Sequence, residues 1–157
     1  FKYYAGLMAG GRGTRLWPLS RKSHLKQCLN LFNGESLLKK TVDRFHDSAS
    51  TKIICTKEIK ESILSSTDVF CDFLLEPRPA NTAAAVSFFI YHLIEEGASL
   101  EDVAIICATD AYIQNENKFR ESSVISAPVF SMHGWTDATP LRIIIFHLTL
   151  IFLLKYC

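Results

Sequence analysis

A glycine-rich stretch near the N-terminus is the part of this sequence best suited to holding a phosphate. Glycines stand at Gly10, Gly11 and Gly13, so backbone amides can approach an anion with no Cβ in the way. Cations follow closely at Arg12, Arg15, Arg21 and Lys26. Their charges suit phosphate oxygens. The stretch therefore predicts a phosphate-binding loop, and a simple tight turn is the alternative.

This loop differs from two common phosphate-binding motifs. The dinucleotide fingerprint needs a third glycine or alanine at a position where this chain has Leu16. The Gly-Lys-Ser/Thr end of a P-loop occurs nowhere in the sequence. The spacing therefore indicates a phosphate site of another kind.

The elements that must position the loop alternate between strands and helices. Apolar runs predict strands at residues 3–8, 51–56, 73–75 and 103–107. Helical patterns follow at residues 36–45, 57–65, 82–96 (capped by Asn81 or Thr82 and stopped by Gly97) and, more weakly, 117–127. The alternation predicts an α/β layered, Rossmann-like domain with a mostly parallel sheet.

Two of these helices carry definite expectations about burial. In the helix at 36–45 one face holds Leu37, Leu38, Thr41, Val42 and Phe45, and the opposite, polar face holds Lys39, Lys40, Asp43 and Arg44. The helix at 82–96 is apolar nearly all round, so we expect it to be well buried.

Ligands of parallel sheets bind outside the carboxyl ends of the strands. The loops at that edge are residues 9–20, 76–82 and 108–113, and each has glycine or polar residues directly after a strand. The sequence therefore predicts a single binding edge to which all three loops contribute.

The first loop and several later motifs resemble the sugar-phosphate nucleotidyltransferases. Residues 7–21, which read LMAGGRGTRLWPLSR, are similar to that family's nucleotide-binding signature, and residues 17–21 resemble its mannose branch. Further similar elements are Lys26-Gln27, Glu35-Ser36-Leu37-Leu38 with Thr41 and Arg44, Glu76-Pro77, Asn81-Thr82-Ala83, and Asp110 with Tyr112-Ile113. The resemblance covers about residues 3–127.

The resemblance implies a chemistry in which GMP is transferred from GTP to mannose 1-phosphate, giving GDP-mannose and pyrophosphate. The sugar phosphate is already an ionised nucleophile, so the protein has to position the phosphates and neutralise their charge. By resemblance, the residues that cradle the nucleotide are Ala9, Gly10, Gly11, Gly13 and Thr14. Arg15 and Lys26 are the implied catalytic residues, the former on the leaving pyrophosphate and the latter on the reacting phosphates.

The remaining implied residues lie in the later loops. Asp110 would help to hold Mg²⁺, a metal that prefers carboxylate and phosphate oxygens. Glu76 and Asn81 would lie near the nucleotide or the sugar. Each residue has a plainer alternative: Arg15 packing over Trp17, Lys26 as a solvated side chain, and Asp110 as a cap after its strand.

Several positions depart from the family pattern. They are Leu25 for proline, Cys28 for an aromatic residue, Ala80 for arginine, Ala84 for proline and Ala111 for histidine. Loss of an arginine or histidine that faces the substrate typically slows such a reaction by about 10²-fold or more. The alternatives are therefore a catalytically impaired nucleotide-binding or regulatory module of the same ancestry, or a non-functional remnant. Within the enzyme hypothesis, an adenylyl or thymidylyl transferase is an alternative to the transfer of GMP.

The end of the chain has a different character, which predicts a partial nucleotide-binding domain at residues 1–127 and a divergent apolar tail at 128–157. Between Ile143 and Leu154 only His147 and Thr149 are polar. These 12 residues fall short of the roughly 20 that a membrane helix needs, so no membrane span is expected. We favour a buried strand or helix over the open side of the sheet, with foreign sequence from a truncated or frame-shifted gene as the alternative.

Composition narrows the class of protein. The 157 residues carry a net charge of +1 and are 48% hydrophobic, as in a single packed domain, which argues against disordered and fibrous classes. A balanced charge does not favour nucleic-acid binding. Five scattered cysteines without a C-x-x-C pair predict reduced thiols in a cytoplasmic protein. The sequence leaves the oligomeric state open, including a homo-oligomer whose second copy completes the sugar site.

Overall fold

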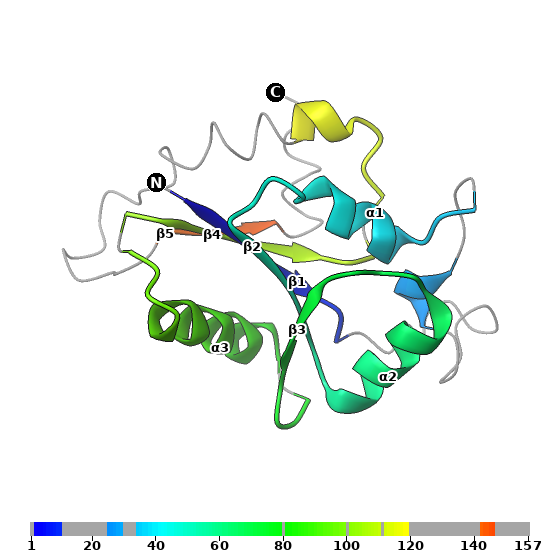
Figure 1. Cartoon of the computed structure of the whole chain (residues 1–157), viewed down its shortest axis with the longest axis horizontal. Helices are drawn as coiled ribbons and strands as arrows, with labels where there is room; N and C mark the ends of the chain where they lie inside the picture. The colour runs from blue at the N-terminus through cyan, green and yellow to red at the C-terminus, as the bar shows by residue number, and fades with distance from the viewer. Residues whose placement is uncertain are drawn as a thin grey trace.

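Five parallel strands form the sheet at the centre of the molecule (Figure 1). The computed structural model describes residues 2–10, 25–29, 34–79, 81–99, 101–110, 112–119 and 142–146. The strands are β1 (Tyr3–Met8), β2 (Ser50–Cys55), β3 (Asp72–Leu75), β4 (Val103–Ala108) and β5 (Arg142–Phe146). The helices are η2 (Lys26–Cys28), a single 3₁₀ turn, and α1 (Leu37–Arg44), α2 (Lys57–Ser66) and α3 (Thr82–Glu95).

The strand order, β3-β2-β1-β4-β5, puts β1 in the middle with later strands added on both sides. Leu7 of β1 pairs with Ile53 of β2 and with Cys107 of β4, and every described pairing is parallel. Each central strand is a short run of apolar residues, as expected where both faces of a sheet are covered. The predicted α/β fold with a parallel sheet is confirmed.

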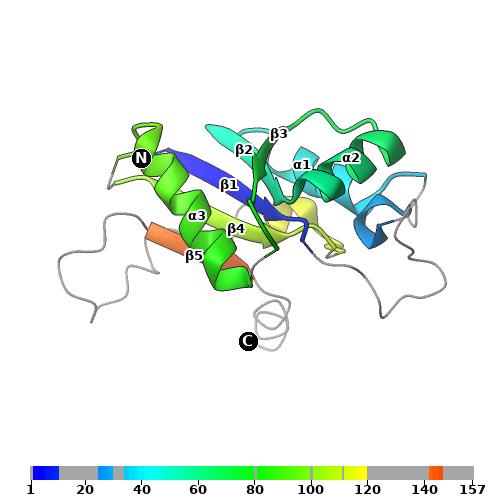
Figure 2. The ribbon, with the colours of Figure 1, turned by 90° about the horizontal axis from the view of Figure 1, so that it is seen from below.

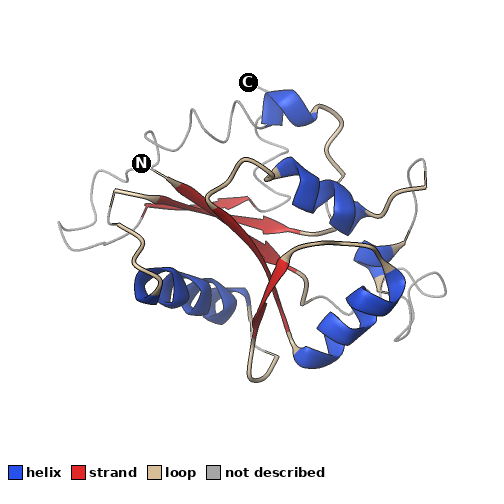
Figure 3. Cartoon of the chain, viewed as in Figure 1, coloured by secondary structure: helices blue, strands red, loops and turns tan. Residues whose placement is uncertain are grey.

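Helices cover both faces of the sheet (Figure 3). Ile53 and Ile105 face α1 and α2, where Leu38, Phe45 and Ile63 complete one core. Their strand neighbours turn to the opposite face, where Ile54, Ala104 and Ile106 pack against Val86, Phe89 and Leu93 of α3. The side-chain period of two therefore divides each strand between two separate cores.

Capping residues mark the helix ends, and those at Asn81 and Gly97 were predicted from the sequence. Ser36 precedes α1 and its hydroxyl accepts a hydrogen bond from the Lys39 amide (3.1 Å). Asn81 precedes α3 and accepts one from the Ala84 amide (3.1 Å). Gly97, just beyond α3, has a φ of +85°, a conformation that L residues with a Cβ adopt only with strain.

The expectation that α3 is well buried is wrong for half of the helix. Tyr91 is 63% exposed and Ile94 42% exposed, while Phe89 and Leu93 are fully buried. The apolar pattern showed no preferred face, but a helix on a sheet can bury only one. The close packing of that face depends on Gly6, because a Cβ there would lie 2.8 Å from two ring atoms of Phe89.

Arg44 also departs from its expected place on the polar face of α1, since its side chain is only 1% exposed. It follows Leu37 by seven residues and Thr41 by three, and this spacing puts it on the same buried stripe. The spacing was therefore available in the sequence, but the charge of the side chain argued against using it.

Strand β5 lies in the apolar tail and pairs with β4 along the sheet edge (Figure 2). Ala104 pairs with Ile143 and Ile106 with Ile145, so this part of the tail extends the sheet as a strand. The predicted boundary at 127/128 lies outside the described residues, as do residues 120–127 of the weaker helix, which begins at Glu116. No helix in the described part of the chain is long and apolar enough to cross a membrane.

Candidate functional site at the carboxyl edge of the sheet

The first glycine-rich loop leaves the sheet at the end of β1, between its two neighbouring strands. The amide of Ala9 donates to the carbonyl oxygen of Ile54 in β2 (3.0 Å), so the sheet holds the loop in place up to this residue. An added Cβ at Gly10 would meet no atom of the described residues within 4 Å, so none of them crowds the backbone at this position. Of the predicted nucleotide-binding residues, the structure describes Ala9 and Gly10. Gly11, Gly13, Thr14 and the predicted catalytic Arg15 lie in the part of the loop outside the description.

A buried side chain fixes the base of this loop. Gln27 of η2 is 3% exposed, and its side-chain amide donates to the carbonyl oxygen of Ala9 (3.1 Å). The hydrogen bond spans 18 residues and ties η2 to the carboxyl end of β1. The backbone of Lys26, a predicted catalytic residue, therefore lies next to the loop, although its side chain is not described.

The second loop of the edge follows β4, directly beside the first. Met8 pairs with Ala108, so the residues that follow these two strands are neighbours at the sheet edge. The amide and the hydroxyl of Thr109 both donate to the carbonyl oxygen of Met8 (3.3 and 3.0 Å). The next residue, Asp110, is partly exposed at the end of β4. Gly10 and Asp110 therefore both lie at the carboxyl end of the two central strands, each two residues beyond the last paired position.

Glu76 directly follows β3 and lies at the same edge of the sheet. Its amide donates to the carbonyl oxygen of Cys55 (2.9 Å), and its side chain is half-buried. Burial raises the pKa of the Glu76 carboxyl above its ordinary value because the charged form loses hydration. Strand β2 stands between β3 and β1, so Glu76 is about 10 Å across the sheet from the glycine loop, at two strand spacings.

Asn81, a predicted nucleotide-binding residue, is the N-cap of α3 in the structure. Its side-chain oxygen caps α3, and the residue is exposed. Gln27 and Thr109 are the two residues at this edge that were not predicted as site residues. Gln27 belongs to a motif that resembles the family, and Thr109 directly follows a predicted strand. Both residues could therefore have been predicted as part of the site from the sequence.

The donor chemistry at this edge fits a hard cation held jointly with a ligand. Among the described residues no group of three or more His, Cys, Asp and Glu side chains could hold a metal by itself. Mg²⁺ commonly takes one or two carboxylates and completes its shell with water and substrate phosphates. A partly exposed Asp110 at the same end of the sheet as the glycine loop therefore fits a metal that binds together with a phosphate.

Comparison with known proteins identifies the family. The nucleotidyl transferase family model matches residues 5–124, which include most of β1, the strands β2 to β4 and the whole of the edge described above. The chain belongs to the nucleotidyl transferase family.

The nucleotidyl transferase relatives are longer than this chain. The alginate biosynthesis protein AlgA of Pseudomonas aeruginosa is 31% identical over 126 residues, which is 76% of this chain and 26% of AlgA. Mannose-1-phosphate guanylyltransferase ManC of Salmonella typhimurium is 31% identical over 77% of this chain and 26% of ManC. A mannose-1-phosphate guanylyltransferase of Sinorhizobium fredii is 40% identical over 93 residues. The chain thus spans about a quarter of the length of the first two relatives.

Solved structures agree with this nucleotidyl transferase fold. A Thermus thermophilus structure described as a mannose-1-phosphate geranyltransferase superposes with a TM-score of 0.73 at 31% identity, over 84% of this chain and 39% of that one. A Helicobacter pylori structure described as a mannose-6-phosphate isomerase superposes with a TM-score of 0.55 at 24% identity, and this likeness concerns the fold alone.

Proposed function

We propose that this chain is the nucleotide-binding part of a mannose-1-phosphate guanylyltransferase, which transfers GMP from GTP to mannose 1-phosphate and releases pyrophosphate. The observation that carries the proposal is that Gly10 and Asp110 each follow by two residues the paired ends of β1 and β4, Met8 and Ala108. A glycine backbone suits phosphate oxygens, and a carboxylate at the same edge suits the cation that accompanies them. Several relatives are named for this activity.

In the proposed reaction a phosphate oxygen of mannose 1-phosphate forms a bond to the α-phosphorus of GTP, and the bond to the leaving pyrophosphate breaks. The backbone amides that begin at Gly10 would hold the triphosphate, and Ala9 anchors them to the sheet. Arg15 would neutralise the charge that grows on the pyrophosphate, and Lys26 would contact the reacting phosphates. When bound, Mg²⁺ supplies further charge neutralisation, and Asp110 is the residue proposed to hold it.

Glu76 and Asn81 would contribute to binding the nucleotide or the sugar. Glu76 is the stronger candidate because burial already raises the pKa of its carboxyl, and a hydrogen bond from a ligand would offset that cost. Asn81 can donate from its side-chain NH₂ while its oxygen caps α3.

A cytoplasmic location is part of the proposal. The described cysteines Cys28, Cys55, Cys71 and Cys107 are all free thiols. Burial raises the pKa of the Cys55 thiol to about 12, and an inert, buried thiol of this kind is typical of proteins in a reducing compartment.

The test is pyrophosphate release by the full chain with GTP, Mg²⁺ and mannose 1-phosphate, run beside a sample without the sugar phosphate. The proposal predicts release that depends on mannose 1-phosphate and is lower with ATP, UTP or dTTP. A folded sample that binds GTP but releases no pyrophosphate would support the nucleotide-binding module instead. Preference for ATP or dTTP would reassign the chain to an adenylyl or thymidylyl enzyme.

A further inference from the structure

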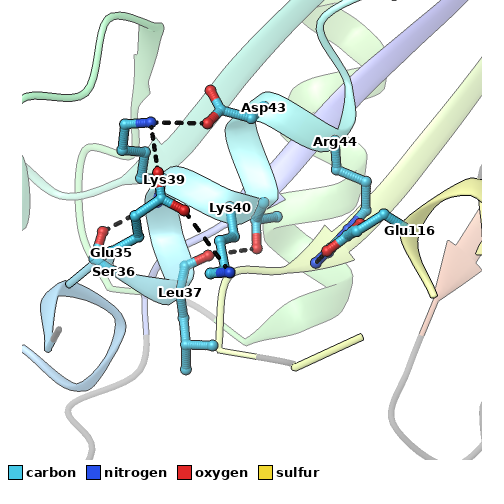
Figure 4. A network of polar contacts seen from close by, with 9 residues as sticks. Glu35, Ser36, Leu37, Lys39, Lys40, Asp43, Arg44 and Glu116 are labelled. Atoms are coloured by element: carbon cyan, nitrogen blue, oxygen red, sulfur yellow. Dashed lines mark hydrogen bonds and ion pairs between the residues drawn. The ribbon is translucent and has the colours of Figure 1, made fainter. Parts of the chain in front are cut away.

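An ion pair between a buried arginine and a partly exposed glutamate joins helix α1 to the segment that follows Asp110. The guanidinium of Arg44 donates from Nη2 to Oε1 of Glu116 (2.9 Å) and from Nε to Oε2, so the two groups meet fork to fork (Figure 4). The partners are 72 residues apart in the chain. Paired hydrogen bonds of this kind fix orientation as well as distance.

The contact extends beyond the two charged groups. The ring of Phe119 lies 5.3 Å from the Arg44 guanidinium and meets the ring of Phe45 edge-on, with 6.2 Å between ring centroids. Asn115 starts the helical turn that presents Glu116 and Phe119, and its side chain accepts from the Lys118 amide (3.0 Å). The segment 112–119 therefore docks on the end of α1 through an ion pair and through contacts of the Phe119 ring with Arg44 and Phe45.

The placement of Arg44 is poorly explained by stability alone. Its side chain is 1% exposed, and its Nη1 atom has no hydrogen-bond partner among the described residues. A buried guanidinium loses hydration free energy, and the attraction within an ion pair only partly offsets this loss. An apolar residue at this position would therefore stabilise the fold at least as well. By contrast, Lys39 on the outer face of the same helix pairs with Glu35 and Asp43 in solvent (Figure 4).

Asp110 lies between two anchors. On its N-terminal side Thr109 is tied to Met8 of β1 by two hydrogen bonds. On its C-terminal side Glu116 is tied to Arg44. Asp110 thus follows directly on a residue fixed to β1 and precedes by six residues one that is fixed to α1.

We propose that the Arg44–Glu116 pair is a positioning device that holds residues 112–119 on α1 and thereby sets Asp110 where it can meet a nucleotide-bound Mg²⁺. The inference rests on the proposed function for the role of Asp110. Arg44 and Glu116 touch neither nucleotide nor metal in this account, and they act through the segment they hold. Groups that orient a metal ligand in this way commonly change metal affinity by about 10- to 100-fold.

The chain offers a matched control at the opposite edge of the sheet. Lys52 of β2 is also buried and pairs with Glu96 beyond the end of α3 (3.0 Å), where His92 lies 3.3 Å from the same carboxylate. Glu96 and Glu116 are similarly exposed, at 46% and 36%. Glu116→Gln and Glu96→Gln each remove the carboxylate that pairs with a buried cation, and only Glu116 lies in the segment that follows Asp110.

The experiment uses the full chain without nucleotide first. Amide hydrogen exchange across residues 112–119 is expected to be about tenfold faster or more in Glu116→Gln, because a charge-assisted hydrogen bond is lost. It is expected to stay at the parent rate in Glu96→Gln. Unchanged exchange in Glu116→Gln would overturn the proposal.

The second readout is the Mg²⁺ concentration that half-saturates binding of a fluorescent GTP analogue. Glu116→Gln is expected to raise this midpoint about tenfold, and Glu96→Gln is expected to leave it unchanged. Faster exchange with an unchanged midpoint would show that the pair serves stability only, and would overturn the positioning role. Glu116→Asp keeps the charge and replaces Glu116→Gln if the latter does not fold.

The two proposals fail in different ways. A parent chain that binds no GTP analogue at any Mg²⁺ concentration contradicts the proposed function, and the exchange rates then decide alone whether Arg44 holds the segment. A parent chain that binds the analogue, with equal Mg²⁺ midpoints in all variants, contradicts the positioning role and leaves the proposed function standing.

Discussion

The side-chain amide of Gln27 donates a hydrogen bond to the main-chain oxygen of Ala9, at a distance of 3.1 Å. Ala9 is the last residue before the glycine-rich loop, and Gln27 is next to Lys26 in η2. One buried contact thus fixes both ends of the segment proposed to surround the phosphates of GTP.

Replacing Gln27 with methionine tests this anchor. Methionine has a similar length but cannot donate to Ala9, so the change leaves a buried carbonyl without its partner and is expected to cost about 1–3 kcal/mol of unfolding free energy. GTP affinity should fall as well, because the loop loses its support. Denaturant unfolding and nucleotide titration provide the measurements. Gln114→Met, at an exposed position, should stay within about 0.5 kcal/mol of the parent.

Two glycine-to-alanine changes separate packing from ligand binding. Gly6→Ala forces a methyl group against the fully buried Phe89 ring, so we expect a loss of about 1–3 kcal/mol in unfolding free energy. In Gly10→Ala the added Cβ meets no atom of the described part of the chain within 4 Å, so the change should leave stability nearly unchanged. The same Cβ would stand where phosphate is proposed to bind. Thermal unfolding and GTP titration of both variants check the pair. Equal GTP affinity in Gly10→Ala and the parent would remove this backbone from the site.

The free energy of unfolding should depend on pH through Asp102, which lies at the amino end of β4, opposite the proposed site. Its carboxylate accepts from the Lys2 amide (2.8 Å) and the Ser99 amide (2.9 Å), and these hydrogen bonds, the first above all, lower the pKa of Asp102 below its ordinary value of 3.8. A lowered carboxyl pKa stabilises the fold above the ordinary value, and the contribution is lost as pH falls through the lowered one. The stability difference between the parent and Asp102→Asn should therefore be constant near neutral pH and shrink below about pH 4.

Unfolding melts across this pH range measure that difference. A gap between the parent and Asp102→Asn that stayed constant down to about pH 2 would exclude the proposed cause.

Changes to the proposed reaction residues should separate turnover from folding. Arg15→Ala is expected to remove most turnover, by about 10²-fold or more, with unfolding unaffected, because it removes a cation from the leaving pyrophosphate. Unchanged turnover in Arg15→Ala would remove Arg15 from the site.

Asp110→Ala should abolish the dependence of GTP binding on Mg²⁺. An Mg²⁺ titration of this variant identical to the parent's would remove Asp110 from the site.

Local sequence signals were sufficient to predict most of the fold. The strands β1, β2 and β4 are short apolar runs, and Ser36, Asn81 and Gly97 mark helix ends by chemistry that acts within a few residues. The parallel direction of the strands followed from their alternation with helices. These features could be predicted because each depends on neighbours in the sequence.

The features that sequence reasoning missed depend on distant contacts. The all-round apolar pattern of α3 gave no sign that Tyr91 would face outward. The burial of Arg44 depends on Glu116, 72 residues later, and the role of Gln27 depends on Ala9, 18 residues before. The pattern of a single sequence does not show which distant residues are in contact. A charged residue is therefore predicted to lie on the surface unless its buried partner is known.

The most direct test of the central claim is a nuclear magnetic resonance titration of the amide-labelled chain with GTP and Mg²⁺. The account predicts that the largest shift changes fall at the carboxyl edge, on Gly10, Thr109 and Asp110, with little change on Ala49 and Asp102 at the opposite edge. Shift changes centred on the opposite edge, or none at saturating GTP, would contradict the assignment of the nucleotide site.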